Sequence, residues 1–267
     1  KYCRPSWKLN ISTETHPTAL VSKKAELGER VSIGPFSIIE SDVKLGNGTS
    51  VGSFTTVKTG TIIGENCQIF HNCTIGEIPQ DLKYTGEKTF VQIGDNVIIR
   101  ESVTINKGTA AHGTTEIGSN VLLMAYVHIA HDCIIGNNVI FANLVTLGGH
   151  VEVNEWASIG GGVLIHQFCK VGSHVFVGGG YRIVQDVPPF IRAAKDPLEY
   201  SGINSMGLQR RGFSQKERNN IKKFYRYYFR SELTRTAALE KAEHEFSSDP
   251  NIKKILEFIY SSERGII

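Results

Sequence analysis

The chain has 267 residues, of which 40% are hydrophobic and 21% are charged, and its formal net charge is +3. This composition is typical of a folded protein with room for an extended repeat core and a smaller second domain, and it excludes a disordered chain. The charge is too mild to indicate a nucleic-acid-binding protein. No apolar run approaches the roughly 20 residues of a membrane-spanning helix, and no signal-peptide pattern opens the chain.

A period of six residues runs through most of the chain. Large apolar side chains recur at every sixth position over residues 21–75, 93–105 and 117–183, and glycine often follows them. Three six-residue strands make a triangular coil of about 18 residues, so residues 18 apart stack and the apolar side chains fill a narrow prism. We expect the small residue after each apolar one to let the chain turn the corner. The pattern predicts a mainly β fold, a parallel β-helix of hexapeptide repeats, over about residues 15–186 of a first domain, 1–186.

Four of the five cysteines occupy the fifth position of their hexads: Cys67, Cys73, Cys133 and Cys169. That position elsewhere holds Val, Thr, Ser or Ala, so we predict that these cysteines are small core residues. The spacing disfavours a disulfide framework or a CxxC metal site, and a reducing compartment follows from that.

Two polar insertions interrupt the hexads, at residues 77–90 and 107–116. Both are rich in turn-forming residues, and we expect them to protrude as loops from the corners of the prism. Loops on a rigid scaffold often carry recognition groups, although harmless surface insertions look the same. Gln80, Asp81 and Lys83 lie close together in the first loop, which favours a functional role.

The hexads end before residues 187–267, which we assign to a connecting segment and a C-terminal α-helical domain. An irregular segment is expected first. Ser214 and Glu217 form a capping-box signature for one helix, and Asp249–Pro250 opens a last one. Residues 233–246 supply a helix between them.

The first of these helices and its approach are strongly basic. The cations are Arg210, Arg211, Lys216, Arg218, Lys222, Lys223, Arg226 and Arg230. A solvated helix face explains such a run as well as an acidic partner or a phosphate ligand does.

Four of the nine histidines cluster at His128, His131, His150 and His166. Their hexads start 18 residues apart, so His131, His150 and His166 should stack on one face, with His128 around the corner. Gly148, Gly149 and Gln167 fall in the same column. Three stacked histidines favour a functional site over incidental surface residues.

Imidazole is a general base at neutral pH, and Asp132 could orient or charge the neighbouring His131. Whether it reaches His131 is open, because adjacent strand residues point to opposite faces. A free amide N–H at Gly149 suits an oxyanion, although a tight corner also explains a glycine. With no G-x-S-x-G elbow and Cys133 expected in the core, direct attack of an acceptor on a thioester is the simplest mechanism.

Several stretches resemble one family closely. They are IGEIPQDLKYTGE, IRESVTI, LLMAYVHIAHDC, HQFC, VGG, QDVPP and RRGFS. Together they are similar to UDP-N-acetylglucosamine acyltransferases, the acyl carrier protein-dependent enzymes that begin lipid A synthesis, and the similarity covers nearly the whole chain.

The resemblance implies a left-handed coil and a homotrimer with active sites between neighbouring prisms. It also implies transfer of a 3-hydroxyacyl group from acyl carrier protein to the 3-hydroxyl of UDP-N-acetylglucosamine, with no cofactor or metal. His131 would be the general base, Asp132 its electrostatic partner and the Gly149 amide the oxyanion donor. Gly179 would floor a roomy acyl pocket.

The remaining matched residues would hold substrates. Asp81 and Lys83 would hold the sugar and its phosphate side, with Gln80 beside them. His128, His150, His166 and Gln167 would line the cleft. Asn204, Arg210 and Arg211 would lie near the nucleotide or the carrier, and the basic helix would meet the acidic carrier protein.

Three residues depart from the bacterial pattern: Asn106 replaces a usual His, Met206 an acidic residue, and Pro197 a His near the acyl pocket. The chain also begins at Lys1 rather than Met, so we expect that an N-terminal piece has been removed, with room for a lost targeting sequence. These features suggest a plant organellar member, which would be mitochondrial; the alternative is the bacterial cytoplasm.

Three rival functions stay open at this stage. The related N-acyltransferase of the same pathway also uses hexads and a histidine, but it usually carries a separate N-terminal domain. Trimeric hexapeptide carbonic anhydrases bind zinc through three histidines across an interface. A catalytically silent scaffold is the third.

Overall fold

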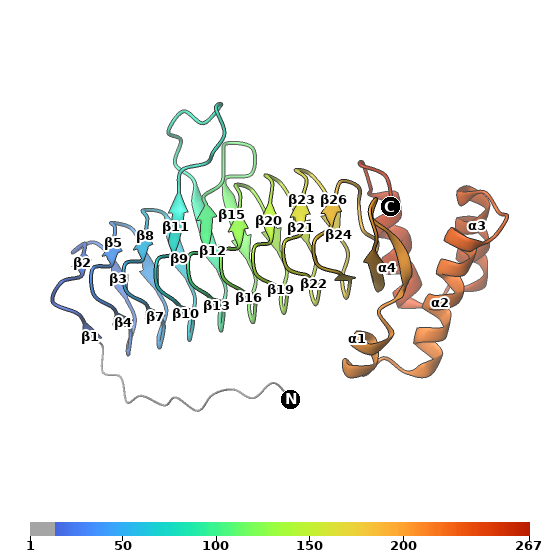
Figure 1. Ribbon diagram of the computed structural model, residues 1–267, viewed down its shortest axis with the longest axis horizontal. Helices are drawn as coiled ribbons and strands as arrows, with labels where there is room; N and C mark the ends of the chain where they lie inside the picture. Colours follow the sequence, from blue (N-terminus) through green and yellow to red (C-terminus); the bar gives the residue numbers. More distant parts are fainter. Residues whose placement is uncertain (1–13) are drawn as a thin grey trace.

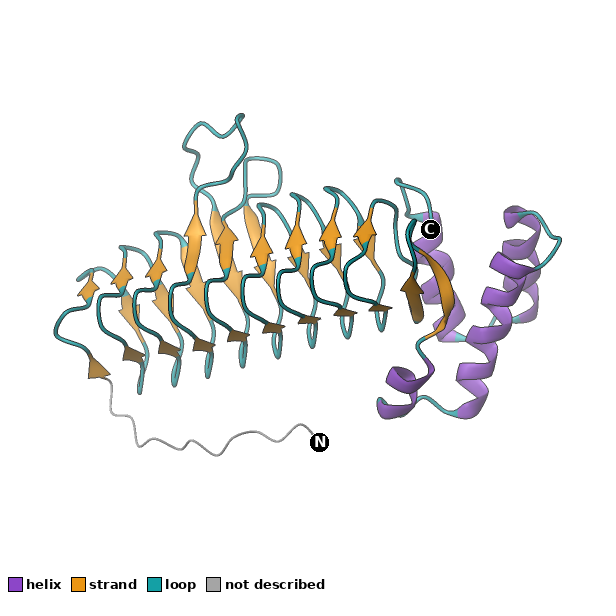
Figure 2. Ribbon diagram, viewed as in Figure 1, coloured by secondary structure: helices purple, strands orange, loops and turns teal. Residues whose placement is uncertain are grey.

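The structure is a computed structural model, and it describes residues 14–267. Short strands form three sheets that make the sides of an elongated prism, and helices close one end (Figures 1 and 2). The first sheet contains β1 (Glu14–Thr15), β4 (Ser32–Ile33), β7 (Ser50–Val51), β10 (Gln68–Ile69), β13 (Ile98–Ile99), β16 (Leu122–Leu123), β19 (Ile140–Phe141), β22 (Ser158–Ile159), β25 (Phe176–Val177), β27 (Ile191–Ala194) and β28 (Glu199–Ile203). Among the described strands, every pairing is parallel except that of β27 with β28.

The other two sheets follow the same order along the prism. The second contains β2 (Leu20–Val21), β5 (Ile38–Ile39), β8 (Thr56–Val57), β11 (Thr74–Glu77), β14 (Thr104–Asn106), β17 (His128–Ile129), β20 (Thr146–Leu147), β23 (Leu164–Ile165) and β26 (Arg182–Ile183). The third contains β3 (Glu26–Leu27), β6 (Lys44–Leu45), β9 (Thr61–Ile63), β12 (Phe90–Ile93), β15 (Thr114–Ile117), β18 (Ile134–Ile135), β21 (Glu152–Val153) and β24 (Lys170–Val171). A hexapeptide-repeat β-helix with a helical C-terminal region is therefore confirmed.

The 18-residue stacking rule holds along the prism. Ile129 pairs with Leu147 and Leu147 with Ile165, and all three side chains are buried. The predicted core cysteines, Cys67, Cys73, Cys133 and Cys169, are buried free thiols, and the fifth cysteine, Cys3, lies outside the described residues. The apolar period thus fixes which coils lie on one another.

The corners differ from the prediction in one respect. The left-handed backbone falls two residues after the small residue, as at Phe36 (φ 57°) and Asn66 (φ 54°). The small residue is needed because the next coil lies against it: a Cβ on Gly64 would lie 2.7 Å from the carbonyl carbon of Gly94. Glycine here permits close stacking of coils, and a different residue makes the turn.

Both insertions leave the prism at the corner between the second and third sheets. The first joins β11 to β12 and the second joins β14 to β15, and both rise from that corner in Figure 1. The second loop is shorter than predicted, residues 107–113, because Thr114 to Glu116 pair with Phe90 to Gln92.

The segment expected to be irregular contains two strands. β27 continues the first sheet beyond β25, and β28 turns back on β27, so the open end of the sheet is covered. Apolar side chains at Ile191 and Ala193 point into the core. The alternation of buried residues in β27 extends over only four residues. It is therefore too brief to predict a strand from the sequence.

Four helices follow: α1 (Ser205–Arg210), α2 (Gln215–Arg230), α3 (Arg235–Glu245) and α4 (Pro250–Tyr260). The capping box of Ser214 and Glu217 is present, and Asp249 caps α4. α1 was not predicted. The buried Tyr225 hydroxyl of α2 donates to the Pro189 carbonyl at 2.6 Å, so the helices are bonded to the end of the prism. Within residues 14–267, no helix combines the length and the apolar character needed to cross a membrane.

Candidate active site

One corner of the prism gathers the predicted reactive residues. Asp132, His150 and Phe168 each make the turn from the second to the third sheet in successive coils, with φ of 58°, 59° and 65°. The two inserted loops leave the same corner in the coils just before Asp132. Each loop replaces the turn at this corner in its own coil. The loops therefore lie next to the turns made by Asp132, His150 and Phe168.

Asp132 does reach His131. The His131 Nδ1 and Asp132 Oδ2 atoms are 2.8 Å apart. Alternation of strand side chains does not apply, because Asp132 is the left-handed corner residue and not part of a strand. Two neighbours in sequence can thus form an imidazole–carboxylate pair.

The Asp132 carboxylate is buried and fully engaged. Its Oδ1 accepts from the backbone N–H of Thr109 at 2.8 Å, and its Oδ2 accepts from the Thr109 hydroxyl at 2.7 Å. Burial raises the pKa of Asp132, but the hydrogen bonds from His131 and Thr109 outweigh it, so the net shift is downward. The Asp132 side chain is therefore an anion at neutral pH.

An anionic Asp132 sets the tautomer of His131. Nδ1 carries the proton that Asp132 accepts, so Nε2 keeps its lone pair and can act as a base. Nε2 faces Gly149, since a Cβ built on Gly149 would lie 2.6 Å from it. Only glycine leaves room for the imidazole in this position.

The Gly149 amide is available as a donor for a structural reason. Gly149 is the third residue of its hexad. Its backbone carbonyl accepts a hydrogen bond from the N–H of Phe168 in the next coil, at 3.1 Å. Among residues 14–267, no acceptor is bonded to the Gly149 N–H. The coil thus leaves an unbonded N–H in the residue that lies against the base.

The other histidines of the cluster take different positions. His150 Nε2 lies 3.7 Å from Asp132 Oδ2, and the His150 ring stacks on Phe168 with centroids 4.6 Å apart. Burial lowers the pKa of His150. His128 Nδ1 lies 2.7 Å from Thr104 Oγ1, and burial followed by the charge of His131 lowers its pKa.

Two members of the predicted cluster lie further out. His166 and Gln167 are exposed, and the His166 Nδ1 bonds the Gln167 carbonyl oxygen at 3.1 Å. Phe168 was not predicted, although it lies 18 residues after His150 and therefore at the same corner of the next coil.

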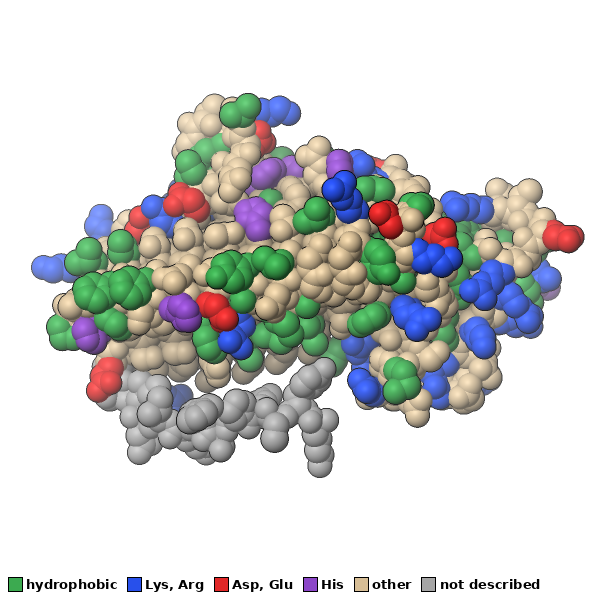
Figure 3. Space-filling view, viewed as in Figure 1, with side chains coloured by type: hydrophobic (Ala, Val, Ile, Leu, Met, Phe, Trp, Pro, Cys, Tyr) green, Lys and Arg blue, Asp and Glu red, His purple; other side chains and the backbone are tan. Residues whose placement is uncertain are grey.

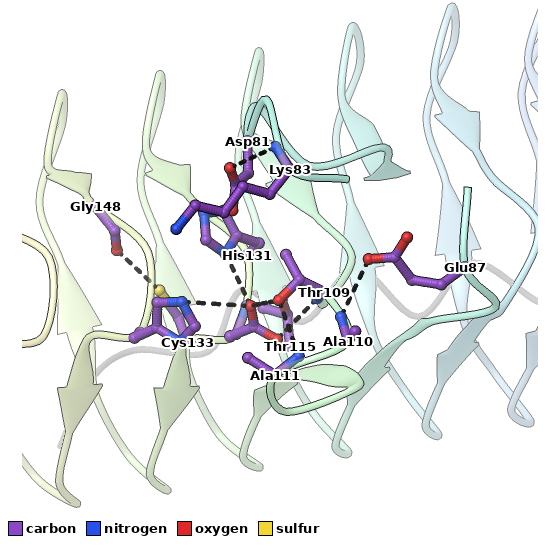
Figure 4. Close-up of polar contacts among 12 residues, drawn as sticks. Asp81, Lys83, Glu87, Thr109, Ala110, Ala111, Thr115, His131, Cys133 and Gly148 are labelled. Atoms are coloured by element: carbon purple, nitrogen blue, oxygen red, sulfur yellow. Dashed lines mark hydrogen bonds and ion pairs between the residues drawn. The ribbon is translucent and has the colours of Figure 1, made fainter. Parts of the chain in front are cut away.

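The first loop hangs over this corner. Figure 4 shows Asp81 and Lys83 on the side of His131, and the Asp81 carboxylate accepts from Lys83 N–H at 2.9 Å. The Asp81 charge acts on His150 and favours its protonated form. Gln80 is exposed. The predicted loop residues are thus brought to the histidines.

The two loops are bonded to each other and to the coil. Glu87 Oε1 accepts from Ala110 N–H at 3.2 Å, which joins the first loop to the second. Asn106 Nδ2 donates to the Ile78 carbonyl at 2.9 Å, and Lys107 N–H donates to the Glu77 carbonyl at 2.9 Å. Asn106, one of the three departures, therefore anchors the base of the first loop.

A second group lies at a different corner, near the helices. Asn204, Arg210 and Arg211 line a hollow of about 1080 Å³ whose lining also includes Trp156 and Lys222. Figure 3 shows Lys and Arg side chains gathered over this helical end of the molecule.

His174 stands behind the second group and was not predicted. Its carbonyl accepts from Asn204 Nδ2 at 2.9 Å, its ring stacks on Phe190, and the Arg211 guanidinium lies over Trp156 at 5.0 Å. Burial, and then the charge of Arg211, lower the pKa of His174 to about 4. The sequence could have indicated His174, because it is the fourth residue of its hexad and lies 18 residues after Trp156.

Gly179 belongs to neither group. It lies at the turn from the first to the second sheet, where a Cβ would meet the Gly161 carbonyl oxygen at 3.0 Å. Within one chain, the predicted residues therefore lie at or against three different corners of the prism.

A metal ion fits the first corner poorly. Ligand atoms of His131, Asp132 and His150 lie within 4.8 Å of one another. However, Asp132 Oδ2 already accepts hydrogen bonds from Thr109 and His131, which a metal ion would have to displace. The donor set suits a hydrogen-bonded base better.

Comparisons with known proteins identify the family of the chain. Residues 186–267 match the family described as Udp N-acetylglucosamine O-acyltransferase, Domain 2, and residues 24–59 and 114–149 match the bacterial transferase hexapeptide family. The acyl-[acyl-carrier-protein]–UDP-N-acetylglucosamine O-acyltransferase of Thermodesulfovibrio yellowstonii is 49% identical over 95% of this chain and 98% of the relative. The enzyme of Chlorobaculum parvum is 53% identical over 94% of this chain and 95% of the relative. The chain belongs to the UDP-N-acetylglucosamine O-acyltransferase family.

Solved structures of UDP-N-acetylglucosamine O-acyltransferase family members have the same fold. The Bacteroides fragilis structure superposes with a TM-score of 0.91 at 44% identity, over 94% of this chain and 99% of the other. The Arabidopsis structure superposes with a TM-score of 0.82 at 36% identity, over 95% of this chain and 99% of the other. Plant organellar membership and mitochondrial localisation stay predictions, since bacterial relatives reach higher identities.

Proposed function

We propose that this protein transfers a 3-hydroxyacyl group from acyl carrier protein to the 3-hydroxyl of UDP-N-acetylglucosamine. The observation that carries the proposal is the juxtaposition of His131 Nε2, with Nδ1 held by Asp132, and the Gly149 amide. Family membership supplies the substrates, because the relatives' names state them.

The chain's own residues account for each proton in the reaction. His131 Nε2 removes the proton from the sugar 3-hydroxyl as that oxygen attacks the thioester carbonyl carbon. The Gly149 N–H donates to the oxyanion of the tetrahedral intermediate. As the C–S bond breaks, His131 returns the proton to the leaving thiolate, and the buried Asp132 anion stabilises the imidazolium in between.

We assign the residues around the dyad to substrate binding. Asp81 and Lys83 hold the sugar and its phosphate side, with Gln80 next to them, from a loop that is bonded at both its base and its far side. The cleft wall is then formed by His128, His150, His166 and Gln167. The low pKa values of His128 and His150 keep their rings neutral, so these rings can accept as well as donate.

The basic helix supports the carrier assignment. Arg210, Arg211 and Lys222 line one hollow with Asn204. An acidic carrier protein or a phosphate of either substrate is attracted there.

We infer that the active protein is a homotrimer with sites between neighbouring prisms. His131 and Gly179 lie at two different corners of a single prism, and Arg211, from the helical region, lies over Trp156 at the third corner. One flat-sided prism cannot bring its own corners together, whereas a neighbouring copy can place one corner against another. The trimer also follows from the family resemblance.

An acceptor comparison tests the proposed activity. UDP-N-acetylglucosamine and a 3-O-acylated glucosamine nucleotide are offered separately with an acyl carrier protein thioester. We expect acylation of the first and none of the second. Acylation of the second alone would favour the N-acyltransferase, and bound zinc with chelator-sensitive carbonic anhydrase activity would favour the metal enzyme.

A further inference from the structure

The second inserted loop contributes a residue to the reactive corner that neither the sequence nor the family resemblance assigned. Thr109 is buried, and both its backbone N–H and its hydroxyl contact the Asp132 carboxylate, at 2.8 and 2.7 Å. Of the three hydrogen bonds that this carboxylate accepts from neighbouring side chains and backbone, Thr109 supplies two and His131 one.

The direction of the Thr109 hydroxyl proton is fixed. The Thr109 Oγ1 accepts from the Ala111 N–H at 3.2 Å, so the hydroxyl proton is free to point to Asp132. An ionised carboxylate can only accept, which agrees with this direction. The hydroxyl therefore donates to Oδ2, the same oxygen that His131 Nδ1 contacts.

The loop is shaped to deliver Thr109 to this place. Gly113, with φ of 83°, donates its N–H to the Thr109 carbonyl at 2.7 Å and closes the loop. Next to Thr109, a Cβ on Gly108 would lie 2.9 Å from Asp132 Oδ1, so the backbone passes against the carboxylate. A harmless surface insertion would have no reason for such a close fit.

We propose that Thr109 is a positioning residue of the acyltransfer reaction: it holds the Asp132 carboxylate in one orientation, so that His131 keeps its proton on Nδ1 and its lone pair on Nε2. This role rests on the proposed function. It gives the second insertion a purpose, since the loop then carries the group that fixes the base.

Two substitutions of Thr109 distinguish the effect of its hydroxyl from the effect of its side-chain shape. Thr109→Val keeps the branched shape and the backbone N–H but removes the hydroxyl, and the exposed Ala111 N–H can turn to water. We expect kcat to fall by roughly 10- to 100-fold, the range of one hydrogen bond to a charged group, with KM nearly unchanged. Thr109→Ser keeps the hydroxyl, and we expect it to restore most of kcat.

Thr115→Val is the matched control. It also removes a buried hydroxyl next to Asp132, but that oxygen accepts from the Asp132 backbone N–H at 2.9 Å and does not touch the carboxylate. We expect a lower melting temperature and a much smaller loss of kcat. If Thr109→Val does not fold, Thr109→Ala takes its place.

A double-mutant cycle with Asp132→Asn decides whether Thr109 acts through Asp132. We expect Thr109→Val to change kcat less than threefold in the Asp132→Asn background, because the anion that it orients is gone. Full kcat in Thr109→Val, or an equal loss in both backgrounds without rescue by serine, would overturn the inference. A wild-type protein that makes no product would instead overturn the proposed function.

Discussion

At the scale of single residues, a buried anion next to a slightly exposed imidazole makes the base. The His131 side chain is 14% exposed and the Asp132 side chain 0% exposed, so the imidazole can meet substrate while its partner is kept from water. Removal of the imidazole should abolish proton transfer without disturbing the core. We expect His131→Ala to lower kcat by roughly 10²–10⁴-fold, the contribution of a general base, in a variant that still folds. Its melting temperature should fall modestly, because the buried Asp132 carboxylate loses one hydrogen bond. His244→Ala, an exposed histidine of α3, is the control, and normal turnover by His131→Ala would contradict the mechanism.

Gly149 offers a steric test of the same geometry. A methyl group there would collide with the His131 imidazole, whose Nε2 lies 2.6 Å from the position of a Cβ. We expect Gly149→Ala to lower kcat at least tenfold, because the ring must move away from the oxyanion donor. Steady-state kinetics with a melting curve measure this. Undiminished kcat in a folded variant would show that the imidazole is not held against Gly149.

His174 should make the protein sensitive to acid. Its pKa is lowered to about 4 in the folded protein, whereas an unfolded histidine has a pKa of about 6.5. The unfolded chain therefore binds an extra proton between these values, and stability is lost as the pH falls through that window. We expect His174→Gln to show a smaller drop in urea midpoint between pH 7 and pH 5 than the wild type. An equal drop would assign the acid sensitivity to other groups.

At the scale of elements, the two inserted loops act as one unit. Glu87 accepts from the Ala110 N–H of the second loop and from the Thr85 N–H of its own loop, at 3.2 and 2.9 Å. Loss of this carboxylate should free the loop that carries Asp81 and Lys83. We expect Glu87→Ala to raise the KM for UDP-N-acetylglucosamine several-fold with a smaller change in kcat. Glu87→Gln keeps one of the two acceptor oxygens, so its KM should lie between those of the wild type and Glu87→Ala. Unchanged KM in Glu87→Ala would show that the loops are held independently.

The hexad period correctly predicted which strands of the prism lie on one another. It did not predict the contacts of the residues that form the corners. It placed Leu147 on Ile129 and so brought His150 and Gly149 to His131. It left the contact of Asp132 open because alternation is a rule of strands, and Asp132 is a corner. Phe168 and His174 were missed because the fourth position of each hexad was not recognised as a stacked column.

The hexad period could not predict the contacts of the inserted loops or of the strands at the end of the prism. Thr109 meets Asp132 through a seven-residue loop, 107–113, whose path depends on local hydrogen bonds and on Gly113. β27 alternates buried and less buried residues with a period of two, and β28 shows no clear period, within a chain dominated by a period of six. The capping signals of Ser214 and Asp249 are local, so the helices that they start were predicted correctly.

At the scale of the whole molecule, the prism keeps its three corners apart, and the proposed trimer brings them together. Co-expression of two inactive variants tests this. If His131 and Arg211 of one site come from different copies, mixed trimers of His131→Ala and Arg211→Ala subunits contain some sites with both residues intact. We expect a measurable fraction of wild-type activity from the mixture and a sedimentation mass of three chains. An inactive mixture of assembled trimers would place both residues of a site on one copy.

We propose above all that this chain acylates the 3-hydroxyl of UDP-N-acetylglucosamine with His131 as the base. Mass spectrometry of the product formed from that nucleotide and a panel of acyl carrier protein thioesters tests it most directly. We predict a single 3-hydroxyacyl addition in ester linkage on the sugar, formed by the wild type and nearly absent with His131→Ala. No acylated nucleotide from any thioester, or the same product at the same rate from His131→Ala, would contradict it.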